Sequence, residues 1–240
     1  MFDHVTIRAS DREASDRFYD TVLQALGIET TYRDGRFTEW DDFALTATDA
    51  DNPVTRGLHI AFGATSQEIA DRFWQAGTEA GHRDDGPPGP RPEYGDDYYG
   101  AFLLDPDGNS AEAVHHDNLR HPGHIDHLWI RVADRAAAQR FYETIAPYCG
   151  FALRDDRERS HFVGAGGSFT LVEGTPTEHV HIAFPASENA TVDSFHRTAI
   201  AAGYRDHGPP GERPRYHPGY YAAYVLDPDG NNIEVVNHNR

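Results

Sequence analysis

A repeat with a constant spacing of 122 to 123 residues constrains this sequence more than any other feature. The segment GPRPEYGDDYYGAFLLDPDGNSAE at 89–112 returns as GERPRYHPGYYAAYVLDPDGNNIE at 211–234, and DHVTIR at 3–8 returns as DHLWIR at 126–131. A fixed offset this long indicates a duplicated domain and excludes a short-period solenoid. We therefore predict two domains, at residues 1–117 and 124–240, joined by a polar linker at 118–123 that contains Pro-Gly.

The overall charge limits the partners that this chain can bind. The formal net charge is −18, and all 21 basic residues are arginine, because the sequence has no lysine. Such a surplus of acid repels phosphate backbones and anionic lipid surfaces, so we expect neither nucleic acid nor a membrane as a partner. A small molecule is the partner that we expect.

Two further features concern the compartment. Cys149 is the only cysteine, so an intrachain disulfide is impossible and a reducing cytoplasm is the simplest location. No apolar run approaches the roughly 20 residues that span a bilayer. The opening stretch MFDHVTIRAS lacks a basic segment followed by an apolar one, so we expect no signal peptide.

Each predicted domain contains the order strand, helix and three strands twice. The stretch FDHVTIR at 2–8 alternates in polarity, which is typical of a strand with one face towards a core. Ser10 and Glu13 match a capping box at the start of a helix that Gly27 ends, and Ser66 opens a second helix that ends near Gly81. The DPDGN segment at 105–109 suits a turn between two strands. The predicted fold class is therefore α+β, with four β-α-β-β-β units.

Three residue types recur at matching places of the repeat. Each domain has a histidine on its first strand, a histidine on the strand that opens its second half, and a glutamate on its last strand. Two imidazoles and a carboxylate that meet on a concave sheet face would bind a divalent metal and leave positions open for water or substrate. Alternatively, these residues are ordinary hydrogen-bonded strand residues. The predicted ligands are His4, His59 and Glu112 in the first domain, and His127, His181 and Glu234 in the second.

With these motifs the sequence resembles the vicinal oxygen chelate superfamily, also called the glyoxalase/bleomycin resistance/extradiol dioxygenase family. The motifs DHVTIRASD, FY, LG, HIAF and DPDGN followed by Glu carry the resemblance, twice over and across almost the whole chain. The resemblance implies βαβββ modules that pair into cups, so that four modules form two tandem cup-shaped domains. It also implies the same six metal ligands, with Fe(II), Mn(II), Zn(II) or Ni(II) as the ion. The family includes lyases, isomerases, ring-cleaving dioxygenases, thiol transferases and metal-free drug-binding proteins, so the fold does not decide the reaction.

The second domain also resembles the signature of extradiol dioxygenases. His217, Tyr224 and Glu234 follow in the order of that signature, with the turn DPDG between the last two, whereas Ala223 and Arg215 depart from it. A phenol and an imidazole beside a metal can donate and accept protons as substrate oxygens change charge. Tyr224 and His217 are therefore candidate catalytic residues. The alternatives are a packed aromatic of the cup wall and an ordinary loop histidine.

The first domain lacks both of these groups. Gly95 stands in place of His217, and Phe102 stands in place of Tyr224. His161, which has no histidine opposite it in the first domain, is a further catalytic candidate. We therefore predict that the two cups are not equivalent and that the second domain holds the active site.

The candidate substrate-binding residues are arginines and tyrosines. Arg131 lies four residues after the first histidine of its domain and resembles a substrate-contacting arginine of glyoxalase I. The Pro-rich segment that contains Arg213 and Tyr216 is predicted to be a loop bordering the cup, and Tyr220 adds aromatic surface. Alternatively, the loop arginine pairs with a nearby carboxylate and the aromatic residues pack in the core.

The predicted function is a metal-dependent enzyme that acts on a small, oxygen-chelating substrate by extradiol-like oxygenation; the aromatic loops suit a planar ring. Two alternatives stay open: a glyoxalase-like lyase or isomerase, and a non-catalytic protein that sequesters an antibiotic or metabolite. A glyoxalase site has a fourth protein ligand, for which Glu173 is the nearest candidate in the second domain and Thr46 or Thr48 in the first. The paired modules also allow a homodimer.

Overall fold

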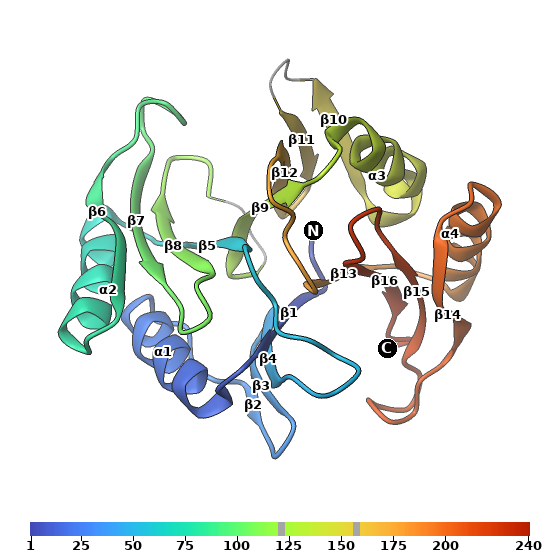
Figure 1. The fold of residues 1–240 in the computed structure, drawn as a ribbon, viewed down its shortest axis with the longest axis horizontal. Coiled ribbons are helices and arrows are strands. Elements are labelled where there is room, and N and C mark those ends of the chain that lie inside the picture. The colour runs from blue at the N-terminus through green and yellow to red at the C-terminus, as the bar shows by residue number, and fades with distance from the viewer. Residues whose placement is uncertain (120–122, 156–158) are drawn as a thin grey trace.

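The computed structural model of the chain describes residues 1–119, 123–155 and 159–240. The predicted linker at 118–123 therefore lies partly outside the described residues. The described residues form sixteen strands and four helices in the order β-α-β-β-β, repeated four times (Figure 1). This order confirms the α+β class.

The four modules follow one another along the chain. The first consists of β1 (His4–Ala9), α1 (Arg12–Ala25), β2 (Tyr32–Arg33), β3 (Phe37–Trp40) and β4 (Phe43–Ala47). The second consists of β5 (His59–Gly63), α2 (Gln67–Glu79), β6 (Arg83–Pro90), β7 (Tyr99–Leu104) and β8 (Ser110–His115). The third consists of β9 (Ile125–Val132), α3 (Arg135–Cys149), β10 (Phe151–Asp155), β11 (Ser160–Gly164) and β12 (Gly167–Glu173). The fourth consists of β13 (His181–Pro185), α4 (Asn189–Ala201), β14 (Arg205–Glu212), β15 (Tyr221–Leu226) and β16 (Asn232–Asn237).

Each sheet joins a module from one half of the chain to a module from the other half. One sheet has the order β14-β15-β16-β13-β1-β4-β3-β2, and the other has β10-β11-β12-β9-β5-β8-β7-β6. The two modules of the first sheet are joined at its middle by the antiparallel pairing of β1 with β13. Those of the second sheet are joined by the antiparallel pairing of β5 with β9. We name the concave faces of these sheets the β1–β13 cup and the β5–β9 cup. The two termini meet in the first sheet, where His238 Nε2 donates to Asp3 Oδ2 at 2.9 Å.

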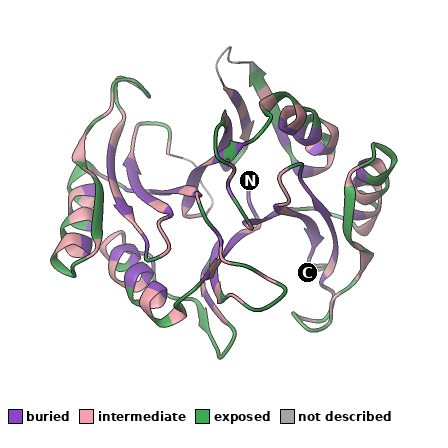
Figure 2. Ribbon diagram, viewed as in Figure 1, coloured by how far each residue is buried: buried purple, intermediate pink, exposed green. Residues whose placement is uncertain are grey.

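The helices, in contrast, pack within each half of the chain. Helix α1 contacts α2, and α3 contacts α4, so each half shares one helical layer (Figure 1). The buried residues lie along the strands and on the inner faces of these helices, whose outer faces are exposed (Figure 2). In β1, Val5 and Ile7 belong to this core, which confirms the alternation expected from the sequence. His4, Thr6 and Arg8 line the cavity of the β1–β13 cup.

The predicted helix starts are confirmed at one place and wrong at another. Ser66 caps α2 as expected, because its side chain accepts the Ile69 N–H. The residue that caps α1 is Asp11 and not Ser10. The hydroxyl of Ser10 instead donates to Asp107 in the turn between β7 and β8.

The Pro-rich segments are not simply loops, as the sequence suggested. Residues 83–90 and 205–212 form β6 and β14, the outermost strands of their modules. Proline is tolerated on an edge strand because one side of that strand makes no ladder hydrogen bonds. Only the stretches that follow, with Arg91 and Arg213 at their start, are turns at the rims of the cups.

None of the helices in the described part of the chain has both the length and the apolar character needed to traverse a bilayer.

Candidate metal centres and the cup between the halves

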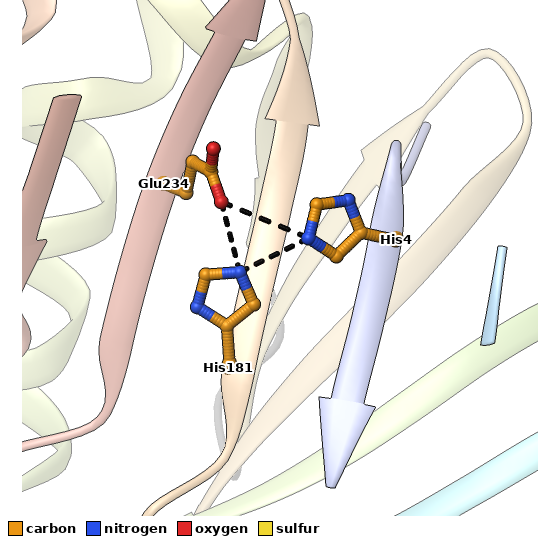
Figure 3. Close-up of side chains that lie close together, drawn as sticks. All are labelled: His4, His181 and Glu234. Atoms are coloured by element: carbon orange, nitrogen blue, oxygen red, sulfur yellow. Dashed lines mark hydrogen bonds and ion pairs between the residues drawn. The ribbon is translucent and has the colours of Figure 1, made fainter. Parts of the chain in front are cut away.

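Two clusters of potential metal ligands lie at the places where the sheets join. His4 from β1, His181 from β13 and Glu234 from β16 place their ligand atoms within 4.8 Å of one another (Figure 3). His59 from β5, Glu112 from β8 and His127 from β9 form the second cluster within the same limit. All six predicted ligands are therefore brought into two clusters, each with two imidazoles and one carboxylate.

The predicted grouping of these ligands is wrong. The sequence suggested that His4 would join His59 and Glu112 within the first half of the chain. Strand β1 instead pairs with β13, with His4 opposite Ala183 and Thr6 opposite His181, so His4 faces the second half. For the same reason His127 joins the first half, because Ala61 of β5 pairs with His127 of β9. The two histidines have exchanged places relative to the prediction.

The cluster in the β5–β9 cup points three potential ligand atoms at one spot. Glu112 Oε2 lies 2.9 Å from His59 Nε2 and 3.5 Å from His127 Nε2. His127 Nδ1 donates to Asp126 Oδ1 at 2.9 Å. This bond fixes the proton on Nδ1 and, in the neutral ring, leaves the lone pair of Nε2 directed towards Glu112.

A hydroxyl group fixes the tautomer of His59 in the same way. Its Nδ1 lies 3.2 Å from Ser110 Oγ. Ser110 already donates its hydroxyl hydrogen to Asp85 Oδ2 at 2.7 Å, so towards His59 it can only accept. His59 therefore carries a proton on Nδ1, and in the neutral ring its Nε2 lone pair faces Glu112. At 2.9 and 3.5 Å, either a proton on an Nε2 atom or a cation must lie between the imidazoles and the carboxylate.

The cluster in the β1–β13 cup is closer still. His181 Nε2 lies 2.9 Å from Glu234 Oε2, and His4 Nε2 lies 3.1 Å from His181 Nε2 and 3.7 Å from Glu234 Oε2 (Figure 3). His4 Nδ1 donates to Asp3 Oδ1 at 2.8 Å, which again leaves the Nε2 lone pair for the cluster.

An amide next to His181 has an unsatisfied buried oxygen. Asn232 Nδ2 lies 2.6 Å from His181 Nδ1, whereas Asn232 Oδ1 is buried with no hydrogen-bond partner in the part of the chain that the structure describes. If this amide is rotated by 180°, Oδ1 accepts a hydrogen bond from the N–H at His181 Nδ1. That rotation satisfies the oxygen and frees the His181 Nε2 lone pair, so this donor set fits a metal ion.

Burial and charge act against each other on these groups. Burial alone would raise the pKa of Glu112, but His127 and His59 hydrogen-bond to its carboxylate and lower that pKa to about 2. Burial would lower the pKa of His127, yet Asp126 and Glu112 raise it to about 9. The pKa of His181 is lowered, chiefly because burial disfavours its charged form. The carboxylates thus stay ionised in both clusters and attract a cation.

A tyrosine orients each glutamate. Tyr220 donates its hydroxyl to Glu234 Oε1 at 2.7 Å, and Tyr98 donates to Glu112 Oε1 at the same distance. Each carboxylate therefore has one oxygen held by a phenol and the other directed at the histidines. Tyr220, predicted to contact substrate, serves to position Glu234.

Among the described residues, neither cluster includes a fourth ligand within the same distance limit. Glu234 on β16 lies opposite Ala183, which is two residues after His181 on β13. The equivalent position beside β1 lies opposite Thr6, two residues after His4, and is occupied by Ala44. In the other cup the matching position is Thr170, opposite Trp129. The candidate fourth ligand, Glu173, lies exposed at the end of β12 and belongs to neither cluster. Each set is therefore two histidines and one carboxylate, which leaves coordination positions open.

The β1–β13 cup holds a cavity of about 960 Å³. The cluster lies in its wall together with five of the predicted catalytic and substrate-binding residues: His217, Tyr224, Arg213, Tyr216 and Tyr220. The ring of Tyr224 lies 6.3 Å from that of His181, centroid to centroid, and its hydroxyl is buried with no partner among the described residues. Burial, followed by the negative charge of Glu234, raises the pKa of Tyr224, so its hydroxyl keeps its proton.

His217 belongs to a chain of hydrogen bonds that reaches the cluster. Its Nε2 lies 2.8 Å from His238 Nδ1, and His238 Nε2 donates to Asp3, the partner of His4. His217 Nδ1 donates to the Pro218 carbonyl at 2.7 Å. Because the carbonyl and the carboxylate can only accept, each imidazole donates one of these bonds, and the third joins the two rings.

Two of the predicted site residues lie in the other cup. Arg131 is on β9, where its guanidinium donates to the Gly57 carbonyl at 3.1 Å. His161 is on β11 of the same sheet, with its Nδ1 2.9 Å from Thr170 Oγ1. Both predictions assumed that the second half of the chain forms its own cup, and the exchange of modules places them apart from Tyr224.

The sequence reasoning missed the residues that support the ligands. Asp3 and Asp126 precede the first histidine of each half in the repeated Asp-His pair, and the repeat itself was the signal. His238 and His116, which bond to Asp3 and Asp126 respectively, also lie at the repeat spacing. Glu39 faces the β1–β13 cup from β3 and had no matching signal.

The repeat also matches a known family. The family model described as Glyoxalase/Bleomycin resistance protein/Dioxygenase superfamily matches residues 1–113 and 124–235. The chain belongs to this superfamily. Among curated protein sequences, none matches this chain.

Members of the superfamily with solved structures share the whole fold. Glyoxalase I from Zea mays aligns with a TM-score of 0.70 and 18% sequence identity, over 99% of this chain and 92% of that one. A protein from Bacillus subtilis subsp. subtilis str. 168, provisionally described as a dioxygenase, aligns with a TM-score of 0.66 and 15% identity, over 100% of this chain and 85% of the other. At such identities the similarity shows the fold, with two tandem glyoxalase-like domains, and leaves the reaction open.

Proposed function

We propose that the chain is a metal-dependent enzyme of the superfamily and that the β1–β13 cup is its active site. The substrate is a small molecule that binds through two adjacent oxygens, and extradiol-like oxygenation of an aromatic diol is the favoured reaction. The observation that carries the proposal is the donor set: two imidazoles whose Nε2 atoms face one carboxylate oxygen, with coordination positions left open.

The residues of this chain fit a divalent ion in both cups. His4, His181 and Glu234 would hold it in one, and His59, His127 and Glu112 in the other; Fe(II), Mn(II), Zn(II) and Ni(II) suit such ligands. When bound, the ion supplies Lewis acidity and two or more positions for substrate oxygens. Asp3 and Asp126 would hold the histidine tautomer that this requires.

The β1–β13 cup has two candidate proton-transfer groups, Tyr224 and His217, in the cavity that its ligands line. The unpartnered hydroxyl of Tyr224 can donate to a substrate oxygen that gains negative charge. His217 hydrogen-bonds to His238 at the edge of the same cavity, where an imidazole can accept or release a proton. In the other cup, Phe102 lies 6.0 Å from His59 where a tyrosine would be needed.

Metal analysis tests the proposal directly. Protein purified without chelator is expected to contain metal, and added Fe(II), Mn(II), Zn(II) or Ni(II) is expected to raise its melting temperature, because a ligand that binds only the folded state stabilises it. The proposal would be contradicted if the purified protein retained no metal and none of the four ions raised its melting temperature.

Single substitutions at Tyr224 and at the equivalent position, Phe102, test which cup is active. Tyr224→Phe is expected to lower kcat by about 100-fold, the range for loss of one proton donor or oxyanion partner. Phe102→Tyr is the matched control and is expected to leave kcat unchanged. The measurement is oxygen consumption with a catecholic substrate and Fe(II). An equal loss in both variants would contradict the assignment of the β1–β13 cup.

Two other functions make different predictions. A glyoxalase-like lyase or isomerase would convert its substrate without consuming oxygen, although neither cluster has the fourth ligand of that chemistry. A protein that only sequesters an antibiotic or metabolite would bind without turnover, and its binding would survive His4→Ala. The ordered donor sets favour the enzyme, because binding alone does not require them.

A further inference from the structure

At one position in the repeated turn at the rim of each cup, the side chain carries opposite charges in the two copies. The turn after β14 reads RPRYH (213–217), and the matching turn after β6 reads RPEYG (91–95). Arg215 therefore stands at the rim of the β1–β13 cup where Glu93 stands at the rim of the other. His217 and Gly95 differ in the same direction. The Arg-Pro before this position and the Tyr after it are the same in both turns.

Arg215 lies against the cavity. It lines the 960 Å³ space, and its guanidinium lies 4.8 Å above the ring of Tyr216 and donates to the Tyr216 hydroxyl at 3.0 Å. The ring of Tyr216 lies 4.8 Å, centroid to centroid, from the tilted ring of Tyr220, which donates to Glu234. A continuous path of side chains thus connects Arg215 at the rim to the metal ligands.

The neighbouring arginines lack carboxylate partners as well. Arg213 donates to the carbonyls of Pro209 and Glu212 at 2.6 and 3.2 Å, with its guanidinium 5.5 Å above the ring of Tyr224. Arg8 donates to the His179 carbonyl. Among the described residues, none of the five arginines that line this cavity forms an ion pair with a carboxylate; they are Arg8, Arg36, Arg213, Arg215 and Arg240. In a chain with 39 acidic residues and 21 arginines, such a group is unexpected unless an anion binds there.

The acidic residues of the same cavity are largely engaged. Asp3 accepts from His4 and His238. Asp34 accepts the backbone N–H groups of residues 36 and 37, and Asp49 accepts those of residues 51 and 52. Glu39 and Asp41 lie on the opposite wall, formed by β3 and the turn that follows it. The carboxylates therefore lie apart from Arg215, which stands at the rim beside Arg213 and Tyr216.

We propose that the β1–β13 cup selects a substrate that carries a carboxylate, which Arg215 and Tyr216 bind at the rim while two adjacent oxygens of the same molecule face the ligand cluster. The proposal rests on the proposed function, because it needs a chelating site at the base of the cavity. Arg215 would pair with the carboxylate, and the Tyr216 hydroxyl, which accepts from Arg215, would donate to it. Glu93 gives the β5–β9 cup the opposite preference.

Two probes with the same diol separate the two proposals. Catechol and 3,4-dihydroxybenzoate differ only in the carboxylate, and both are titrated calorimetrically, without oxygen, into the full chain loaded with Fe(II). We expect 3,4-dihydroxybenzoate to bind about 10-fold more tightly than catechol, since one partly exposed charged pair contributes on this scale. Arg215→Glu and the milder Arg215→Gln are expected to abolish this ratio without changing the affinity for catechol. Glu93→Arg, the matched change in the other cup, is expected to preserve it.

Each outcome decides one of the proposals. If catechol binds and the carboxylate gives no gain in affinity, the inference about the rim is wrong and the proposed function stands. The inference is also overturned if the ratio persists in both Arg215 variants. If neither probe binds the Fe(II)-loaded chain, the chelating site is absent and both proposals fail. Arg215 is exposed in a turn, so neither variant is expected to affect folding.

Discussion

Replacing His4 with alanine is expected to remove the same metal ion that His181→Ala removes, although the two residues are far apart in the sequence. Wild-type protein is expected to bind two divalent ions per chain, one in each cup. Either variant should bind one, with an affinity at the damaged cup lowered by more than about 100-fold, since even changes in groups that support a ligand cost 10- to 100-fold. The double variant His4→Ala/His181→Ala should still bind one ion, because both changes affect one site.

The opposite pairing gives the control. His4→Ala combined with His127→Ala is expected to bind no metal, because these residues serve different cups. His196→Ala, on the outer helix α4 and paired with Asp206, should retain both ions. Metal content after gel filtration, measured by atomic absorption, checks the wild type and all five variants. If His4→Ala and His181→Ala together removed both ions, the exchange of modules between halves would be contradicted.

Phe169→Ala is expected to reduce the free energy of unfolding by about 3–5 kcal/mol, which is typical for truncating a buried phenylalanine. Phe169 on β12 is 1% exposed and lies at the centre of an aromatic cluster. Its ring lies 4.8 Å from Tyr142 of α3 and 5.1 Å from Phe151. Truncation leaves a cavity between the sheet and its helix that these rigid rings cannot fill.

Thermal unfolding followed by circular dichroism measures this effect. A loss of this size corresponds to a drop of about 6–20 °C in melting temperature for a chain of this length. Tyr32→Ala, an aromatic residue that is 50% exposed on the edge strand β2, is the control and should change stability by less than about 0.5 kcal/mol. Equal effects of the two substitutions would contradict the assignment of the core.

Much of the fold could be predicted because it follows from local patterns and from the repeat. The alternation in the first strand gives the exposed and buried faces of β1, and the side-chain cap at Ser66 gives the start of α2. Where two neighbouring residues can both cap a helix, the pattern is ambiguous. Asp11 caps α1 because Ser10 binds Asp107, a residue 97 positions away that no local pattern indicates.

The site could be predicted in its residues but not in its assembly. Each histidine and glutamate of the clusters follows from residue type and recurrence. Which strands meet depends on long-range pairing, and the modules share one pattern, so β1 could pair with β5 or with β13 equally well by sequence. The pairing with β13 decides that His4 joins Glu234. It also decides that His161 and Arg131 lie away from Tyr224.

A crystal structure of the metal-loaded chain with anomalous diffraction at the absorption edge of the bound metal tests the central claim most directly. We predict one anomalous peak about 2.0–2.2 Å from His4 Nε2, His181 Nε2 and a carboxylate oxygen of Glu234. A second peak is predicted among His59, His127 and Glu112. Absence of both peaks, or a peak bound by His127 together with His181 and Glu234, would contradict the account.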